Sequence, residues 1–205
     1  MSNELIAELI RRLAAQERRI ERLESQEALY LPAYDDLPPM PIVAARLGAT
    51  APTLVTFKGN IQQYTFDNND DVVYGATEIT HGWKEGTILY PHIHWATNGL
   101  EATEKGVKWR LGYSIGDSDE AFSTAAALFA TGTIPANTTD RTHYVTAFAP
   151  TIDCTNCRIG AYITWVLTRV ATEHANGEPA ANPFALAIGF HALQNAIGSR
   201  ELYVK

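Results

Sequence analysis

Cysteine is scarce in this chain, and it has no long apolar run and no surplus of basic residues. Two of the 205 residues are Cys, too few for the disulfide framework of a small secreted domain. No apolar run approaches the roughly 18–20 residues of a membrane-spanning helix, and the first residues lack the pattern of a secretory signal. The net charge is −7, which leaves no basic stripe for nucleic acid. We therefore expect a protein made in the cytoplasm that binds neither membrane nor nucleic acid.

Sequence motifs of the common catalytic classes are missing as well. The chain has no G-x-S-x-G, no H-E-x-x-H and no glycine-rich phosphate loop. The acidic cluster at 67–71 lacks the glycine and the distal glutamate of a calcium loop, so we interpret it as a turn. These absences predict a protein that is not an enzyme, has no catalytic residues and needs no cofactor.

The first thirty residues carry the clearest pattern in the chain. Apolar residues recur there at alternating intervals of three and four, which is the heptad spacing of a coiled coil. The a positions and then the d positions are Ile6, Leu13, Ile20, Leu9, Gln16 and Leu23. Arg and Glu surround this stripe, and no Gly or Pro occurs before Pro32. The pattern predicts a coiled-coil oligomerisation helix over 1–30. The alternative is a single amphipathic helix lying on its own domain.

The number of chains in this coiled coil is open to two interpretations. Ile at a with Leu at d is typical of parallel dimers. Residues 19–24, however, read RIERLE, which resembles the R-h-x-x-h-E pattern of short trimeric coiled coils. In that pattern Arg19 covers the core and pairs with Glu24 of a neighbouring chain. Residues 12–17 repeat the pattern with Gln16 in an apolar slot, where a polar residue fixes the register. We therefore predict a homotrimer.

Prolines and then a change of period divide the rest of the chain. Four prolines between positions 32 and 41 exclude a continuing helix, so we predict a Pro-rich linker over 31–52 that is extended and packed. From residue 53 the apolar period becomes two, most clearly at 109–115. Eight to ten strands joined by short loops, with no further long helix, predict a mainly β fold. We expect an antiparallel β-sandwich, jelly-roll-like, over 53–205.

The individual strands are predicted from short alternating or apolar segments. A hairpin is expected around the turn at Gly59 and Asn60. The segment 159–170 is apolar on both faces, as in a central strand or one buried between subunits. The predicted strands are 54–57, 61–66, 72–80, 87–95, 109–115, 126–134, 143–148, 159–170, 183–191 and 202–204.

His92 and His94 are the candidate metal ligands. Residues two apart on a strand share a face, so both imidazoles could hold one ion. With Gly86 they form G-x5-H-x-H, which resembles the first metal motif of the cupins, and His191 and Asn195 have the H-x3-N spacing of the second. The glutamate of the first motif and the P-x-G of the second are missing. A cupin-like metalloenzyme is therefore the weaker alternative, and we predict no metal and two structural histidines.

Cysteines and aromatic residues each admit a structural and a functional interpretation. Cys154 and Cys157 have the spacing of half a zinc site, but no second pair of ligands follows, so we predict two free thiols in a β-turn. The four Trp and nine Tyr either fill the core and interfaces or line a carbohydrate platform. We favour the core and interfaces.

Two stretches of the chain resemble a family of tailed-bacteriophage proteins. They are LYPHIHW at 89–95 and GFH at 189–191, followed by GSRELYVK at 198–205. Members of that family carry an H-H-W or V-H-W strand and end in F-H-Y … G-S-R-x-x-Y-x-K. Here Ala192 stands at the position of the aromatic residue. The resemblance covers roughly 87–205 and implies a β-sandwich virion structural protein, trimeric, in contact with other phage structural proteins of the capsid or tail.

The coiled coil, the linker and the sandwich agree with this resemblance. We therefore expect a trimeric capsid decoration, cement protein, spike or head fibre, made in the host cytoplasm and located in the virion. The alternative is a tail or neck fibre-like module that binds a host surface glycan through exposed aromatic residues.

Overall fold

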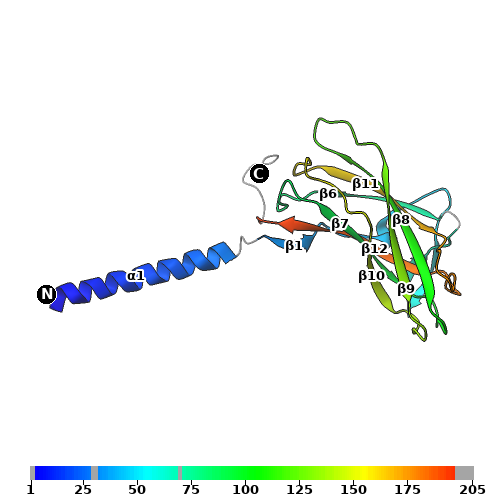
Figure 1. Ribbon diagram of the computed structural model, residues 1–205, viewed down its shortest axis with the longest axis horizontal. Helices are drawn as coiled ribbons and strands as arrows, with labels where there is room; N and C mark the ends of the chain where they lie inside the picture. The colour runs from blue at the N-terminus through cyan, green and yellow to red at the C-terminus, as the bar shows by residue number, and fades with distance from the viewer. Residues whose placement is uncertain (1–2, 29–31, 69–70, 197–205) are drawn as a thin grey trace.

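The computed structural model has one helix, which extends away from a body of two β-sheets (Figure 1). It describes residues 3–28, 32–68 and 71–196, and the helix side chains from 10 to 22. The predicted strand 202–204 and the motif at 198–205 lie outside the described residues. The helix is α1 (Asn3–Ala28), and a short 3-10 turn, η1 (Ile42–Ala44), lies in the body. The strands are β1 (Ala33–Asp36), β2 (Met40–Pro41), β3 (Arg46–Leu47), β4 (Thr53–Lys58), β5 (Ile61–Thr65), β6 (Val72–Glu78), β7 (Leu89–Ala96), β8 (Lys105–Gly116), β9 (Ala126–Ile134), β10 (His143–Ala147), β11 (Tyr162–Val170) and β12 (Phe184–Gln194).

The strands form two antiparallel sheets. A seven-stranded sheet has the order β10-β7-β12-β5-β4, and β1 and β2 pair with β12 along the edge that β5 also uses. A five-stranded sheet has the order β3-β6-β11-β8-β9. The prediction of a mainly β, antiparallel fold with one N-terminal helix is confirmed. The pairing of α1 with other chains stays a prediction.

Side chains from both sheets meet in a single hydrophobic core. On β8, Trp109 and Leu111 are fully buried while Arg110 is exposed, as the alternation at 109–115 predicts. From the other sheet, Ile93 and Trp95 of β7 enter the same core. Burial of an apolar side chain of this size contributes about 1.5–3 kcal/mol. A register slip of one residue would turn all of them to solvent, so the alternation fixes the pairing.

The segment 31–52, predicted as a linker, adds strands to both sheets. From it, β1 and β2 pair with β12 in one sheet, and β3 pairs with β6 in the other. Leu37 and Ile42 are fully buried in the core. The prolines end α1 but leave room for short edge strands, where a missing N–H is tolerated. From Ala33 onward this segment is therefore part of the two-sheet body.

Two strands differ in detail from their predictions. β11 is the predicted central strand, but its outward residues are not covered within one chain, and Tyr162 is 48% exposed. In β12 a bulge between Ala185 and Ala187 changes the alternation. Ala185 is fully buried and Leu186 is only half-buried, although strict alternation along 183–191 would place Leu186 on the same face as Ile188. A β-bulge adds one residue to one strand and shifts every later side chain, which alternation alone does not reveal.

No helix among the described residues is long and apolar enough to cross a membrane.

Candidate functional site

The stripe of α1 is the first predicted site, and the part of it that the structure describes faces solvent. Leu13 is 57% exposed and Ile20 is 53% exposed, and Gln16 and Arg19 are exposed beside them. The helix lies apart from the sheets (Figure 1), so the alternative of a helix packed on its own domain is not observed for these residues. The side chains of the other predicted oligomerisation residues, Ile6, Leu9, Leu23 and Glu24, lie outside the described residues, although the helix backbone includes them.

The second site is a cluster of histidines on the outer face of the seven-stranded sheet. His92 lies on β7, Asp36 on β1 and His191 on β12. Oδ1 of Asp36 is 3.4 Å from Nε2 of His191 and 3.7 Å from Nε2 of His92. The candidate ligand atoms of these three residues all lie within 4.8 Å of one another. One carboxylate and two imidazoles thus converge from three adjacent strands.

The register of the strands explains why these residues meet. Asp36 is paired with His191 across β1 and β12, and Gly189 is paired with His92 across β12 and β7. A Cβ at Gly189 would lie 2.5 Å from Nε2 of His92, so only glycine leaves room for the imidazole in this position. The small residue at 189 therefore accommodates a histidine of the same sheet.

Burial lowers the pKa of two histidines on this face. The pKa of His92 is lowered, chiefly by burial and further by His191 and His94, while Asp36 and a backbone bond to Tyr90 oppose the change. The pKa of His94 is lowered by burial first and then by His143. A lowered pKa means that these imidazoles are neutral at pH 7, the form in which histidine binds metal ions.

His94, the other predicted ligand, has a different partner. Its Nδ1 is 3.0 Å from Nε2 of His143 on β10, and the two rings are stacked. One ion held by His92 and His94 together was the weaker alternative, and the ligand group of the structure does not include His94. His92 instead meets Asp36 and His191. The H-x3-N spacing marked His191 in the sequence, but nothing marked Asp36, because the segment around it did not read as a strand.

The cupin comparison fails on the position of the cluster. The core-facing residues of β7 include Leu89, Ile93 and Trp95, and His92 precedes Ile93 and faces the opposite side of the sheet. The metal site of a cupin lies inside its barrel, between the two sheets, and this cluster does not. The second-motif asparagine, Asn195, follows β12, and its backbone N–H donates to the carbonyl of Gly82 at 3.0 Å.

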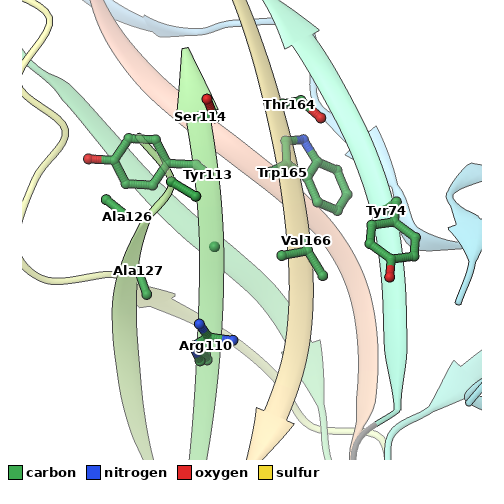
Figure 2. A pocket seen from close by; sticks show the side chains of 11 residues that line it. Tyr74, Arg110, Tyr113, Ser114, Ala126, Ala127, Thr164, Trp165 and Val166 are labelled. Atoms are coloured by element: carbon green, nitrogen blue, oxygen red, sulfur yellow. The ribbon is translucent and has the colours of Figure 1, made fainter. Parts of the chain in front are cut away.

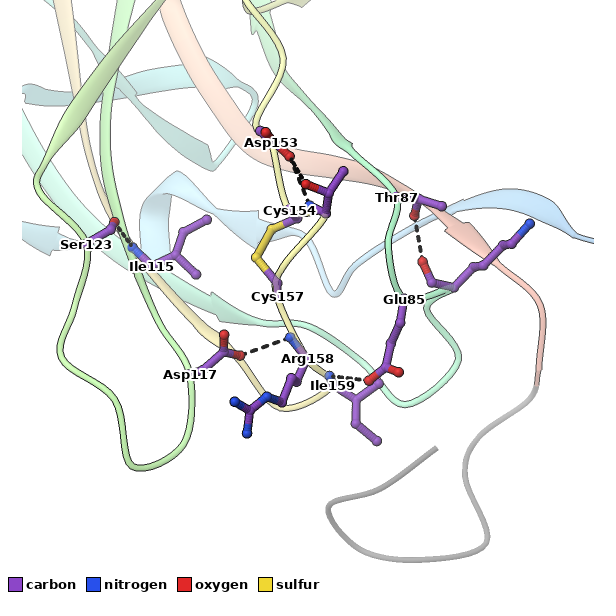
Figure 3. The surroundings of a disulfide bond; sticks show 12 residues. Glu85, Thr87, Ile115, Asp117, Ser123, Asp153, Cys154, Cys157, Arg158 and Ile159 are labelled. Atoms are coloured by element: carbon purple, nitrogen blue, oxygen red, sulfur yellow. Dashed lines mark hydrogen bonds between the residues drawn. A yellow bond between two sulfur atoms is a disulfide. The ribbon is translucent and has the colours of Figure 1, made fainter.

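The cysteines form a disulfide between Cys154 and Cys157, so the prediction of two free thiols is wrong (Figure 3). The predicted β-turn is present, since the N–H of Cys157 donates to the carbonyl of Cys154 at 2.9 Å. Their Cα atoms are 4.9 Å apart, within the range that a disulfide spans. In the same loop, Asp117 accepts from the N–H of Arg158. The disulfide therefore lies in a loop that other bonds also anchor.

Removal of this disulfide will lower the free energy of unfolding by about 2 kcal/mol, because cross-linking a loop of about four residues removes little unfolded-state entropy. Urea unfolding of the double variant Cys154→Ser, Cys157→Ser measures the change. The unmodified protein treated with a reductant should show a loss of similar size. Equal stability of the oxidised and reduced protein would contradict the expectation.

The aromatic residues mostly fill the core, as we favoured. Trp83, Trp95 and Trp109 are fully buried and Trp165 is 2% exposed, so no tryptophan is available for a glycan platform. The exposed aromatic side chains among the described residues are Tyr34, Tyr74, Phe122, Phe129 and Tyr162.

A shallow groove of about 350 Å³ lies on the outer face of the five-stranded sheet (Figure 2). Tyr74 and Arg110 flank it, and Gly112 and Val166 line it. None of its described lining residues is a carboxylate, thiol or imidazole, so it offers no acid–base pair. The groove adds no catalytic candidate.

Comparisons with known proteins neither support nor oppose these interpretations. The chain matches no family model, no curated protein and no solved structure. The function therefore has to be argued from the residues and their geometry.

Proposed function

We propose that this protein is a homotrimeric structural subunit of a bacteriophage particle, a capsid decoration, cement protein, spike or head fibre with a coiled-coil stalk. The observation that carries the proposal is the exposed apolar stripe of α1. Leu13 and Ile20 occupy a positions on a helix that no other described part of the chain covers. An isolated helix gains little stability in water unless its apolar face is packed. A second and a third copy of the same helix supply the matching face.

The composition of the stripe supports three copies of the helix. Arg19 precedes Ile20, and Glu24 follows in the position that pairs with Arg19 of a neighbouring chain. The described Arg19 side chain is exposed, as a residue at the rim of a helix interface is before assembly. Other phage structural proteins of the capsid or tail are the partners that the resemblance at 87–205 implies.

The body supports the proposal through its connectivity. From β5 to β12 the chain passes repeatedly between the sheets, which gives β10-β7-β12-β5 facing β6-β11-β8-β9. Eight strands connected in this way make a jelly roll, an architecture that occurs in viral capsid proteins. We therefore assign the body to this architecture as part of the proposal. A stalk that gathers such bodies raises their effective concentration, so weak contacts between them add.

The absolute mass in solution tests the proposal. Light scattering after size exclusion should give about three times the 22.5 kDa of one chain. A dimer would refute the trimer, and a monomer at micromolar concentration would refute the oligomeric stalk altogether. The same measurement on a chain that lacks residues 1–29 shows whether the body also holds the trimer.

A further inference from the structure

We propose that Asp36, His92 and His191 form a binding site for a divalent transition-metal ion, with Zn²⁺ as the ion that their chemistry fits best. Two imidazole nitrogens and one carboxylate oxygen are a common donor set for zinc, with a fourth position left for water. The site does not depend on the proposed virion function, because it lies within one chain.

The two distances from Asp36 to the histidines are close to those between ligands of one ion. Ligand atoms about 2.0–2.2 Å from a tetrahedral Zn²⁺ lie about 3.3–3.6 Å from one another. Oδ1 of Asp36 is 3.4 Å from Nε2 of His191 and 3.7 Å from Nε2 of His92. Hydrogen bonds between such atoms are shorter, about 2.7–3.2 Å. Both distances from Asp36 are thus longer than a usual hydrogen bond and close to the separation of two ligands of one ion, and all three ligand atoms lie within 4.8 Å of one another.

A buried oxygen without a partner is the independent observation. Oδ1 of Asp36 is shielded from solvent and accepts no hydrogen bond. An unpaired buried carboxylate oxygen is costly, and a cation between it and the two imidazoles removes that cost. No Lys or Arg forms a described ion pair with Asp36, whose recorded ionic contacts are the two histidines.

The surroundings allow an ion to enter and hold the ligands in place. His191 is 51% exposed, so its side chain is open to solvent and to an entering ion. His92 is almost fully buried between the other groups and Gly189, so its ring is already oriented. One exposed ligand and one buried ligand give an entry path and a preformed half-site.

An ion at this site would join three strands side by side. β1 is the first strand after α1, and it pairs with β12 through only four residues, from Ala33 to Asp36. Asp36 is the last residue of β1, so an ion bound to it and to His92 fastens this short strand across β12 to β7. In the proposed stalked trimer, that bond would strengthen the connection between the helix and the body. This last consequence rests on the proposed function.

Metal binding to the untagged full-length protein tests the site. After treatment with a chelator, the protein is titrated with ZnCl₂ in competition with a chromophoric chelator. We expect one ion per chain and a rise in melting temperature with Zn²⁺, because a ligand that binds only the folded state stabilises it. The variants Asp36→Asn and His191→Ala alter partly exposed side chains, so they should fold. They should bind Zn²⁺ at least about 100-fold more weakly, a larger loss than that of a group which only orients a ligand.

Three further variants make the test specific. Gly189→Ala keeps all three ligands but displaces the His92 ring, so it should also weaken binding, by about 10-fold or more. His174→Ala is the matched control, since His174 pairs with Glu104 at 3.1 Å outside the cluster. It should bind Zn²⁺ like the unaltered protein, and His94→Ala, which removes a ring beside His92, should still bind one ion per chain. Binding below one ion per chain overturns the site, and so does binding that His94→Ala abolishes while Asp36→Asn and His191→Ala leave it unchanged.

Discussion

Replacement of Arg169 by methionine will lower the free energy of unfolding by about 3–5 kcal/mol. The Arg169 side chain is 2% exposed and lies on the core side of β11. Its guanidinium pairs with Glu178 and donates to the carbonyl of Phe66 and to Oδ1 of Asn182, both at 2.9 Å. Methionine fills a similar volume but leaves all three acceptors without this donor, and a partly buried carboxylate without its counter-ion.

The pKa of Arg169 shows the same balance of effects. Burial lowers the pKa most, and the opposing charge of Glu178 is the main influence that raises it. The charge of Glu178 therefore offsets part of the cost of burying this cation. Removing both charges should cost less than removing one. The double variant Arg169→Met, Glu178→Gln should recover part of the lost stability. In this variant the amide oxygen of the glutamine at position 178 can still accept from the N–H of Thr172, as Oε1 of Glu178 does at 2.5 Å.

An exposed ion pair provides the control for this prediction. Arg158 and Glu120 form an ion pair at 2.7 Å, and their side chains are 64% and 55% exposed. Arg158→Met should change stability by less than about 1 kcal/mol, because solvent screens exposed pairs. Urea unfolding of the three variants measures the differences. A loss for Arg169→Met no larger than that for Arg158→Met would show that the buried network does not stabilise the fold.

Arg169 also illustrates which contacts of the fold cannot be predicted from the sequence. The hairpin around Gly59 and Asn60 and the strand Ala126–Ile134 are present as predicted, since their signals are local. The segment 159–170 was predicted to be apolar on both faces, yet it carries this buried cation. Its partners lie on loops, and a loop contact leaves no period in the sequence.

The short strands within 33–47 were not predicted from the sequence, for a related reason. A strand of two to four residues has no measurable alternation, and prolines within it indicate a loop. Only the pairing with β12 and β6 makes these residues strands.

In the histidine cluster, too, one residue has a local sequence signal and its partners do not. His92 was recognised because His94 follows two positions later and the two share a face of β7. The residues that meet His92 come from β1 and β12, which lie far from it in the chain. The sequence alone therefore identifies a candidate ligand, while the register of the sheet determines its partners.

Replacement of Leu13 or Ile20 by aspartate will convert the proposed trimer to monomers if the stalk is the main contact. Both residues lie at a positions, and each gains about 1.5–3 kcal/mol on full burial. For the three copies of one position the loss is roughly 5–9 kcal/mol, before the cost of placing three carboxylates together. A loss of this size weakens assembly by at least about 1,000-fold.

Ala15→Asp is the matched control for the stalk, because it adds the same charge on the other side of the helix. In a single chain Ala15, Leu13 and Ile20 are all exposed, so without a partner the three substitutions should have the same small effect. A difference in solution mass between Ala15→Asp and the other two therefore reports the contact between chains. If all three variants keep the mass of three chains, the body holds the trimer and the stripe serves another partner. If the unaltered protein is a monomer, the exposed stripe needs a partner other than a second copy, and the proposed homotrimer is wrong.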